Sequence, residues 1–131
     1  MRVHDFEGWL AASLAAQPWV GDVARWSTDG GPKPVGVTLN GKIQMQMVKA
    51  ESGAVYTGEW EQPAPAPAVE GSPTDPVSWA AAVADVIRAA QHPGVKDVQT
   101  YAEWGGSTKP AGVRVVLVDG SQIYGSIIAI R

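Results

Sequence analysis

Two stretches of the chain carry apolar residues at the spacing of a helical face, one near its start and one past its middle. The first stripe consists of Phe6, Trp9, Leu10 and Leu14. The second consists of Trp79, Val83, Val86 and Ile87. Asp5 and Asp75 suit the N-cap positions, and Pro76 suits the first helical position. Pro18 and the run 92–94 (His-Pro-Gly) mark the two exits, so the pattern predicts two amphipathic helices.

After each predicted helix the apolar period changes to two, which is typical of strands. Asn40-Gly41 and Asp119-Gly120 are strong hairpin signals, each between apolar runs. Residues 43–47 alternate apolar and polar, which indicates a half-buried strand, and further strands are expected within 54–60 and 95–104. Residues 113–118 and 122–130 are apolar at alternate and intervening positions, which predicts central strands covered on both faces.

The two halves of the chain repeat the same order of features. Residues 18–23 (PWVGDV) match 93–98 (PGVKDV), and 33–37 (KPVGV) match 109–113 (KPAGV), with Trp26 and Trp104 between the matched runs. The repeat predicts a duplicated unit in which these two tryptophans occupy equivalent places. The hairpins leave an alternative open: Val55-Tyr56 can align with Ile123-Tyr124 instead, and the Asn40-Gly41 hairpin is then an insertion in the first half.

The expected fold class is α+β, built from a duplicated unit of one helix plus antiparallel strands. Neither unit can bury its apolar face alone, so we expect two helices packed on one antiparallel sheet or on two small sheets. The organisation is then a first repeat at 1–61, an Ala/Pro-rich spacer at 62–74 and a second repeat at 75–131.

Composition narrows the function classes. The chain of 131 residues has no cysteine, which excludes disulfides, thiolate chemistry and cysteine zinc sites. Its net charge of −3, with no basic run, argues against sequence-independent nucleic-acid binding. No apolar stretch has the length of a signal core or a membrane span. We therefore expect no membrane association and a location in a host cytoplasm or in a virion.

Candidate catalytic and ligand-binding residues are few. The Gly-Gly loops before Lys33 and Lys109 could approach an anion, but they lack a P-loop pattern and are better interpreted as paired loops leading into strands. The only imidazoles, His4 and His92, have no partner spacing for a metal or a general base. Ser13 and Ser78 lie in predicted helices without a nucleophile elbow, and Asp22 and Asp97 suit turn capping. We expect no catalytic, cofactor or metal site.

Six tryptophans are many for this length, and they divide by the repeat. Trp9, Trp79, Trp26 and Trp104 are expected in the core. Trp19 and Trp60 have no counterpart, so they are candidate partner contacts, together with Lys33 and Lys109. Alternating Ala-Pro in the spacer buries little apolar surface, so we expect residues 60–75 to lie against a partner or a neighbouring copy.

These patterns favour a non-enzymatic structural or protein-interaction protein that works within a homo- or hetero-oligomer. The leading hypothesis is a phage virion accessory, either a capsid-decorating or a head–tail component. The alternative is a small cytosolic regulator or inhibitor that binds a host protein or a nucleoprotein. An enzyme with a site of unfamiliar pattern is the third hypothesis.

Overall fold

A computed structural model describes residues 3–26, 35–50, 66–106 and 111–130 of the chain. Along the chain the elements are α1 (Val3–Ala15), β1 (Val23–Arg25), β2 (Val35–Leu39), β3 (Ile43–Ala50), α2 (Pro76–Ala90), β4 (Val95–Thr100), α3 (Tyr101–Trp104), β5 (Gly112–Leu117) and β6 (Gln122–Ile130). Helices and antiparallel strands therefore combine in one α+β fold, which confirms the predicted class. The proposed third strand at 54–60 lies outside the described residues.

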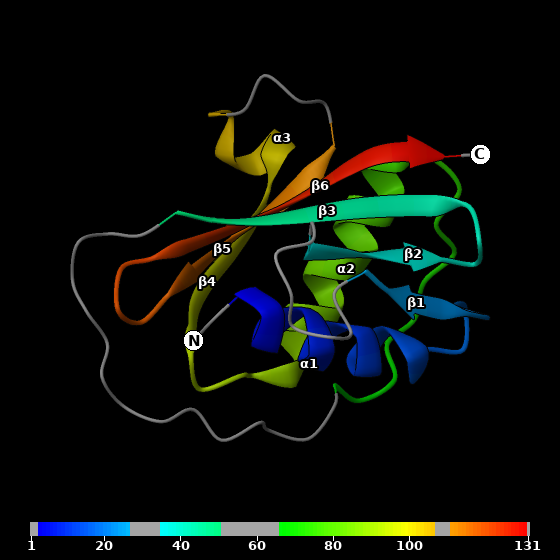
Figure 1. Cartoon of the computed structure of the whole chain (residues 1–131), viewed down its shortest axis with the longest axis horizontal. Helices are drawn as coiled ribbons and strands as arrows, with labels where there is room; N and C mark the ends of the chain where they lie inside the picture. Colours follow the sequence, from blue (N-terminus) through cyan, green and yellow to red (C-terminus); the bar gives the residue numbers. More distant parts are fainter. Residues whose placement is uncertain (1–2, 27–34, 51–65, 107–110, 131) are drawn as a thin grey trace.

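The strands form one sheet in the order β1-β2-β3-β6-β5-β4, and every neighbouring pair is antiparallel. The first half of the chain supplies β1 to β3 and the second half supplies β4 to β6 (Figure 1). The two halves join at the centre, where β3 pairs with β6 and Met45 faces Ile127. Of the two predicted arrangements, a single sheet is the one that forms.

Both predicted hairpins are confirmed. Asn40 and Gly41 have φ angles of 54° and 66°, the left-handed values that a tight two-residue turn requires, and they join β2 to β3. Gly120, with φ 88°, lies in the turn that joins β5 to β6. The two turns join corresponding strands of the two halves; Val55 and Tyr56, on which the alternative alignment depends, lie outside the described residues.

The helix ends agree with the sequence in the second half and differ in the first. Asp75 caps α2: its carboxylate accepts from the Ser78 backbone N–H at 2.7 Å, while the Ser78 hydroxyl accepts from the Asp75 N–H at 2.9 Å. Pro76 occupies the first helical position, as predicted. The prediction of Asp5 as an N-cap was wrong, because α1 already begins at Val3 and contains Asp5 in its first turn.

Both long helices cover the same face of the sheet. α1 packs on β1 to β3 and α2 on β4 to β6, and in Figure 1 α2 passes behind β2 and β3. Both predicted apolar stripes are buried, and they meet inward-facing strand residues that include Val37, Leu39, Met45, Val113, Val115, Leu117 and Ile123. We call this the helix face and the opposite one the outer face.

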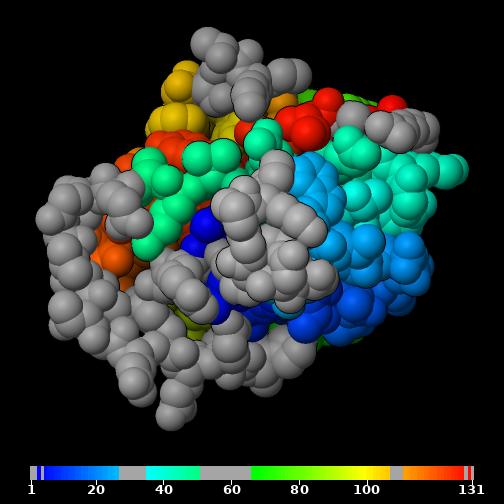
Figure 2. Space-filling view, in the orientation of Figure 1, coloured from blue at the N-terminus to red at the C-terminus, as the bar shows by residue number. Residues whose placement is uncertain are grey.

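The outer face is not covered as the sequence indicated. Val116 is only half-buried and Val118 is 50% exposed, so the expectation that β5 is covered on both sides was wrong. Val48 is 53% exposed and follows the inward-facing Met47 on β3, so it also stands on the outer face, and Ile128 of β6 is 48% exposed. Figure 2 shows side chains of β3 and the end of β6 at the surface from this side.

Strand pairing follows the matched runs of the sequence. Val23, in the first run, faces Leu39 across β1 and β2. Val98, at the corresponding place in the second run, faces Val115 across β4 and β5. Each matched valine therefore pairs with the residue that lies three positions after the glycine of the KPxGV segment in its own half.

Candidate protein-interaction site

Of the four sequence-predicted contact residues, the structure describes only Trp19. Trp60, Lys33 and Lys109 lie outside the described residues. Trp19 is half-buried: its ring packs on Trp79 with a centroid distance of 5.7 Å, and its indole N–H donates to the Val69 carbonyl at 3.0 Å. A shallow groove runs beside it, lined by Pro18, Trp19, Glu70, Gly71 and Ser72.

The described part of the Ala/Pro-rich spacer is held by its own domain. The Gln17 side chain binds both sides of the segment, donating to the Pro67 carbonyl at 3.1 Å and accepting from the Val69 N–H at 2.8 Å. The Ser13 hydroxyl accepts from the Ala66 N–H at 3.0 Å, and Ala66 is 4% exposed. The expectation that these residues need a partner to hold them was wrong, because side chains of α1 and the loop after it satisfy their backbone groups.

Replacing Gln17 by alanine should release this segment, because one side chain supplies two of its hydrogen bonds. We expect the free energy of unfolding to fall by about 1–2 kcal/mol and the Val69 amide to exchange its hydrogen much faster. Hydrogen exchange followed by NMR measures both effects. Ala12→Ser, on the exposed side of α1, is the control. Unchanged protection of Val69 would show that Gln17 does not hold the segment.

Aromatic, amide and arginine side chains occupy the outer face of the second half. Arg114 on β5 is half-buried, and its guanidinium carbon lies 5.0 Å from the centroid of the Trp104 ring. Trp104 packs in turn on Tyr124 of β6, with ring centroids 5.6 Å apart. We call Trp104, Arg114 and Tyr124 the outer-face cluster.

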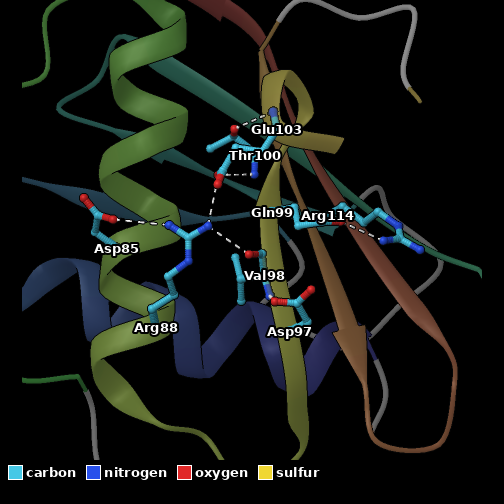
Figure 3. Close-up of polar contacts among 8 residues, drawn as sticks. All are labelled: Asp85, Arg88, Asp97, Val98, Gln99, Thr100, Glu103 and Arg114. Atoms are coloured by element: carbon cyan, nitrogen blue, oxygen red, sulfur yellow. Dashed lines mark hydrogen bonds and ion pairs between the residues drawn. The ribbon is translucent and has the colours of Figure 1, made fainter. Parts of the chain in front are cut away.

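Two glutamines orient the guanidinium of Arg114. Its Nε donates to Oε1 of Gln122 at 3.0 Å, and its Nη1 donates to Oε1 of Gln99 at 2.9 Å; Figure 3 shows the second contact. Tyr124 also donates to the Gln122 oxygen. These bonds use Nε and Nη1, and Nη2 donates to neither amide. Amide oxygens orient the cation, but they bring no negative charge to neutralise it.

A short helix positions Trp104 at this edge of the sheet. Thr100 and Glu103 form a capping box around α3, in which each side chain accepts from the backbone N–H of the other at 3.2 and 3.0 Å. Gly105 ends the helix in the left-handed region, with φ 73°. The indole then lies against Gly106, where a Cβ atom would come within 2.5 Å of the ring, so a larger residue here would displace the indole.

Arg88 connects α3 to the rest of the fold. Its Nη2 donates to the Val98 carbonyl at 2.9 Å and to Glu103 at 3.0 Å, and Nη1 lies 3.4 Å from Asp85 (Figure 3). The Thr100 backbone N–H and then Arg88 lower the pKa of Glu103 to about 2. This carboxylate therefore stays ionised and bonded at neutral pH, which fixes α3 and the tryptophan that it carries.

Two tryptophans expected in the core belong instead to the outer face. Trp26 lies over Gly36, where a Cβ would come within 2.6 Å of the ring, and Trp104 lies on Arg114; both are half-buried. The predicted equivalence of these two residues was wrong, because the ring over Gly112 belongs to Tyr101. Trp9 and Trp79, at 3% and 5% exposure, are in the core as predicted.

The remaining candidate residues hold structural positions. Ser78 caps α2, and the Asp97 carboxylate accepts from the Val98 N–H at 2.9 Å beside an irregularity in β4. Asp22 lies in the turn before β1, where its carbonyl accepts from the Asn40 N–H at 2.8 Å. His4 lies in α1, and its side chain is not among those that the structure describes.

His92 is buried at the end of α2, where it is 4% exposed. Its Nδ1 accepts from the Gly94 N–H at 2.9 Å, and its ring meets Trp9 edge to face at 4.8 Å. Burial lowers the pKa of His92, so the neutral ring is favoured. A ring enclosed in this way is poorly placed to exchange protons with a substrate.

The outer-face cluster was missed at the sequence level although its members have a recognisable spacing. Arg114 stands between Val113 and Val115 on β5, and Gln122 and Tyr124 flank Ile123 on β6; all three apolar residues are buried, which places the polar ones on one face of adjacent strands. The capping pattern Thr-x-x-Glu at 100–103 was the available signal for α3.

No helix in 3–26, 35–50, 66–106 or 111–130 is long and apolar enough to cross a membrane. Within these ranges, no three His, Cys, Asp or Glu side chains gather in a way that could hold a metal ion. Comparison with protein families, with curated proteins and with solved structures found no match to this chain.

Proposed function

We propose that this chain is a non-enzymatic protein-interaction protein and that its contact surface is the outer face of the sheet. The observation that carries the proposal is the outer-face cluster, in which Trp104, Arg114 and Tyr124 touch one another and are all half-buried. Tryptophan, tyrosine and arginine are the residue types most enriched among those that dominate binding energy at protein interfaces.

The neighbouring positions support the same surface. Val48 pairs with Tyr124 across β3 and β6 and is 53% exposed. An apolar side chain beside an aromatic–arginine centre, with amide side chains around it, gives the composition expected of a protein contact. On the helix face, most apolar residues of the described part of the chain are buried between the helices and the sheet.

Both partner classes considered from the sequence use this kind of surface. A virion accessory would bind a particle protein or a neighbouring copy, and a regulator or inhibitor would bind a cellular protein. Hydrogen bonds within the domain already hold residues 66–69 in place. Their position therefore gives no support to the virion role over the regulator role. Size-exclusion chromatography of the isolated protein, with mass spectrometry of purified particles, separates the two roles.

The contact surface itself is tested by affinity purification from the cells that make the protein. We expect a protein partner, or further copies, to be retained by the native chain and lost with Trp104→Ser combined with Tyr124→Ser. A hot-spot aromatic contributes about 2 kcal/mol or more, so the combined loss should exceed a hundredfold in affinity. The matched control is Ala12→Ser with Ala81→Ser, both exposed on the helices.

Two results would contradict the proposal. One is equal retention by the outer-face variant when thermal unfolding shows that it is folded. The other is that the native chain retains nothing and stays monomeric at the concentration found in those cells.

We further propose that the fold arose by duplication of one helix-plus-strands unit. The support is the sheet order, in which β1, β2 and β3 mirror β4, β5 and β6, and the matched pairings of Val23 and Val98. The aromatic–glycine contacts add to it, since Trp26 over Gly36 and Tyr101 over Gly112 hold corresponding places. An experimental structure tests it: the two halves should superpose with Gly36 on Gly112, and unrelated backbone paths there would contradict duplication.

A further inference from the structure

We propose that Arg114, flanked by Trp104 and Tyr124, binds a carboxylate side chain on an extended acidic segment of the partner protein. The inference rests on the proposed function and specifies the chemistry of the partner at that surface. The contact would be a charge-assisted hydrogen bond from the guanidinium to an Asp or Glu, with neighbouring apolar residues of the segment on the exposed Val48 of β3.

The charge state of Arg114 is the first argument. Arg25 has the carboxylate of Glu7 at 2.8 Å, and Arg88 has that of Glu103 at 3.0 Å. Arg114 is oriented instead by two neutral amides and an indole ring, and no carboxylate pairs with it in the part of the chain that the structure describes. A half-buried guanidinium without a counter-ion would gain from an incoming carboxylate.

Preorganisation is the second argument. Two glutamine oxygens and the indole ring fix the plane of the guanidinium, while Nη2 donates to neither amide. An incoming carboxylate could therefore accept from Nη2 without disturbing the existing bonds. Because little side-chain freedom remains to be lost at Arg114, binding carries a smaller entropic cost than it would at a surface lysine.

Comparison with the first half of the chain argues for a single carboxylate. Thr38 on β2 holds the place that corresponds to Arg114 on β5. Each lies two residues after the glycine that an aromatic ring covers, Gly36 in the first half and Gly112 in the second. The Trp26 indole N–H donates to the Thr38 hydroxyl at 2.9 Å, which closes that place with a neutral pair. The single guanidinium of the outer-face cluster suits one carboxylate better than the repeated phosphates of a nucleic acid.

A displayed library of random 12-residue peptides tests the inference with the full chain as bait. We expect peptides selected on the native chain to be enriched in Asp or Glu beside apolar residues, and the enrichment to disappear on Arg114→Gln. A selected peptide should bind at least tenfold more weakly to Arg114→Gln and, independently, when its own Glu is replaced by Gln. Lys42→Gln removes the same charge from the β2–β3 turn and should leave binding unchanged.

The peptide-side replacement leaves the fold of the protein untouched, so it stays decisive if Arg114→Gln is unstable. NMR gives the location: the Trp104 indole N–H and the Arg114 Nε–H should shift with the Glu peptide and not with its Gln counterpart. Recovery of no binding peptide, or of peptides without acidic enrichment, would overturn the inference. The inference would also be overturned if a 20-nucleotide single-stranded DNA bound at Trp104 more tightly than the selected acidic peptides do. Peptides that bind the outer face independently of Arg114 would overturn it while leaving the proposed function standing.

Discussion

Replacing Glu7 by alanine should lower the free energy of unfolding by about 3 kcal/mol. Glu7 lies in α1 with an exposed fraction of 0%, and its two oxygens serve two different strands. Oε1 accepts from Nε of Arg25 on β1 at 2.8 Å, and Oε2 accepts from the Gly36 N–H on β2 at 2.9 Å. Removing the carboxylate leaves a partly buried cation and a buried backbone donor without these bonds, and it loosens the contact between α1 and the sheet.

Urea unfolding followed by tryptophan fluorescence measures the change. Asp85→Ala is the matched control, because it removes a carboxylate from an exposed ion pair with Arg88 at 3.4 Å. Exposed pairs of this kind contribute little, so the control should change stability by less than about 0.5 kcal/mol. A Glu7→Ala variant as stable as the control would show that the buried pair contributes no net stability.

Replacing Gly36 or Gly112 by alanine should each cost about 3 kcal/mol, because both glycines are enclosed by backbone as well as by a ring. A Cβ at Gly36 would lie 2.3 Å from the Met45 carbonyl oxygen and 2.6 Å from Trp26. A Cβ at Gly112 would lie 2.5 Å from the Gly125 carbonyl oxygen and 2.4 Å from Tyr101. Rotating the ring away relieves only half of each clash, since the carbonyl belongs to the neighbouring strand.

Thermal unfolding of both variants measures the effect. Gly21→Ala is the control, because its added Cβ would meet only the Asn40 side chain at 3.4 Å, an ordinary contact. We expect similar losses at Gly36 and Gly112 and almost none at Gly21. If either alanine were accepted without loss, the close approach of ring, glycine and neighbouring strand would not contribute to stability there.

Features encoded by local spacing were predictable from the sequence. The helical stripes, the Asp75 cap and the two hairpin turns depend on residues a few positions apart, so the chain reveals them directly. The class followed too, because two amphipathic units with short connections have few ways to bury their apolar faces.

Features that depend on which distant residues meet were not predictable. Trp26 and Trp104 hold matching places in the sequence, but the ring that covers Gly112 belongs to Tyr101. The short helix α3 places Trp104 against Arg114 instead. The Ala/Pro-rich spacer has few large apolar residues, so its sequence predicts no packing on the domain. Gln17 nevertheless donates to one of its carbonyls and accepts from one of its amides. Such pairings require the tertiary arrangement, which composition does not contain.

The central pairing of β3 with β6 has a consequence for the route by which the chain folds. Every other strand pair joins segments of the same half, so those contacts close short loops. The β3–β6 ladder joins Met45 to Ile127, and it forms only after the longest loop in the sheet has closed. On a ribosome β3 emerges long before β6, and its hydrogen-bonding edge faces solvent until the last strand arrives. The edge of β3 is therefore open to pairing with a neighbouring chain until β6 has been made and has docked on it.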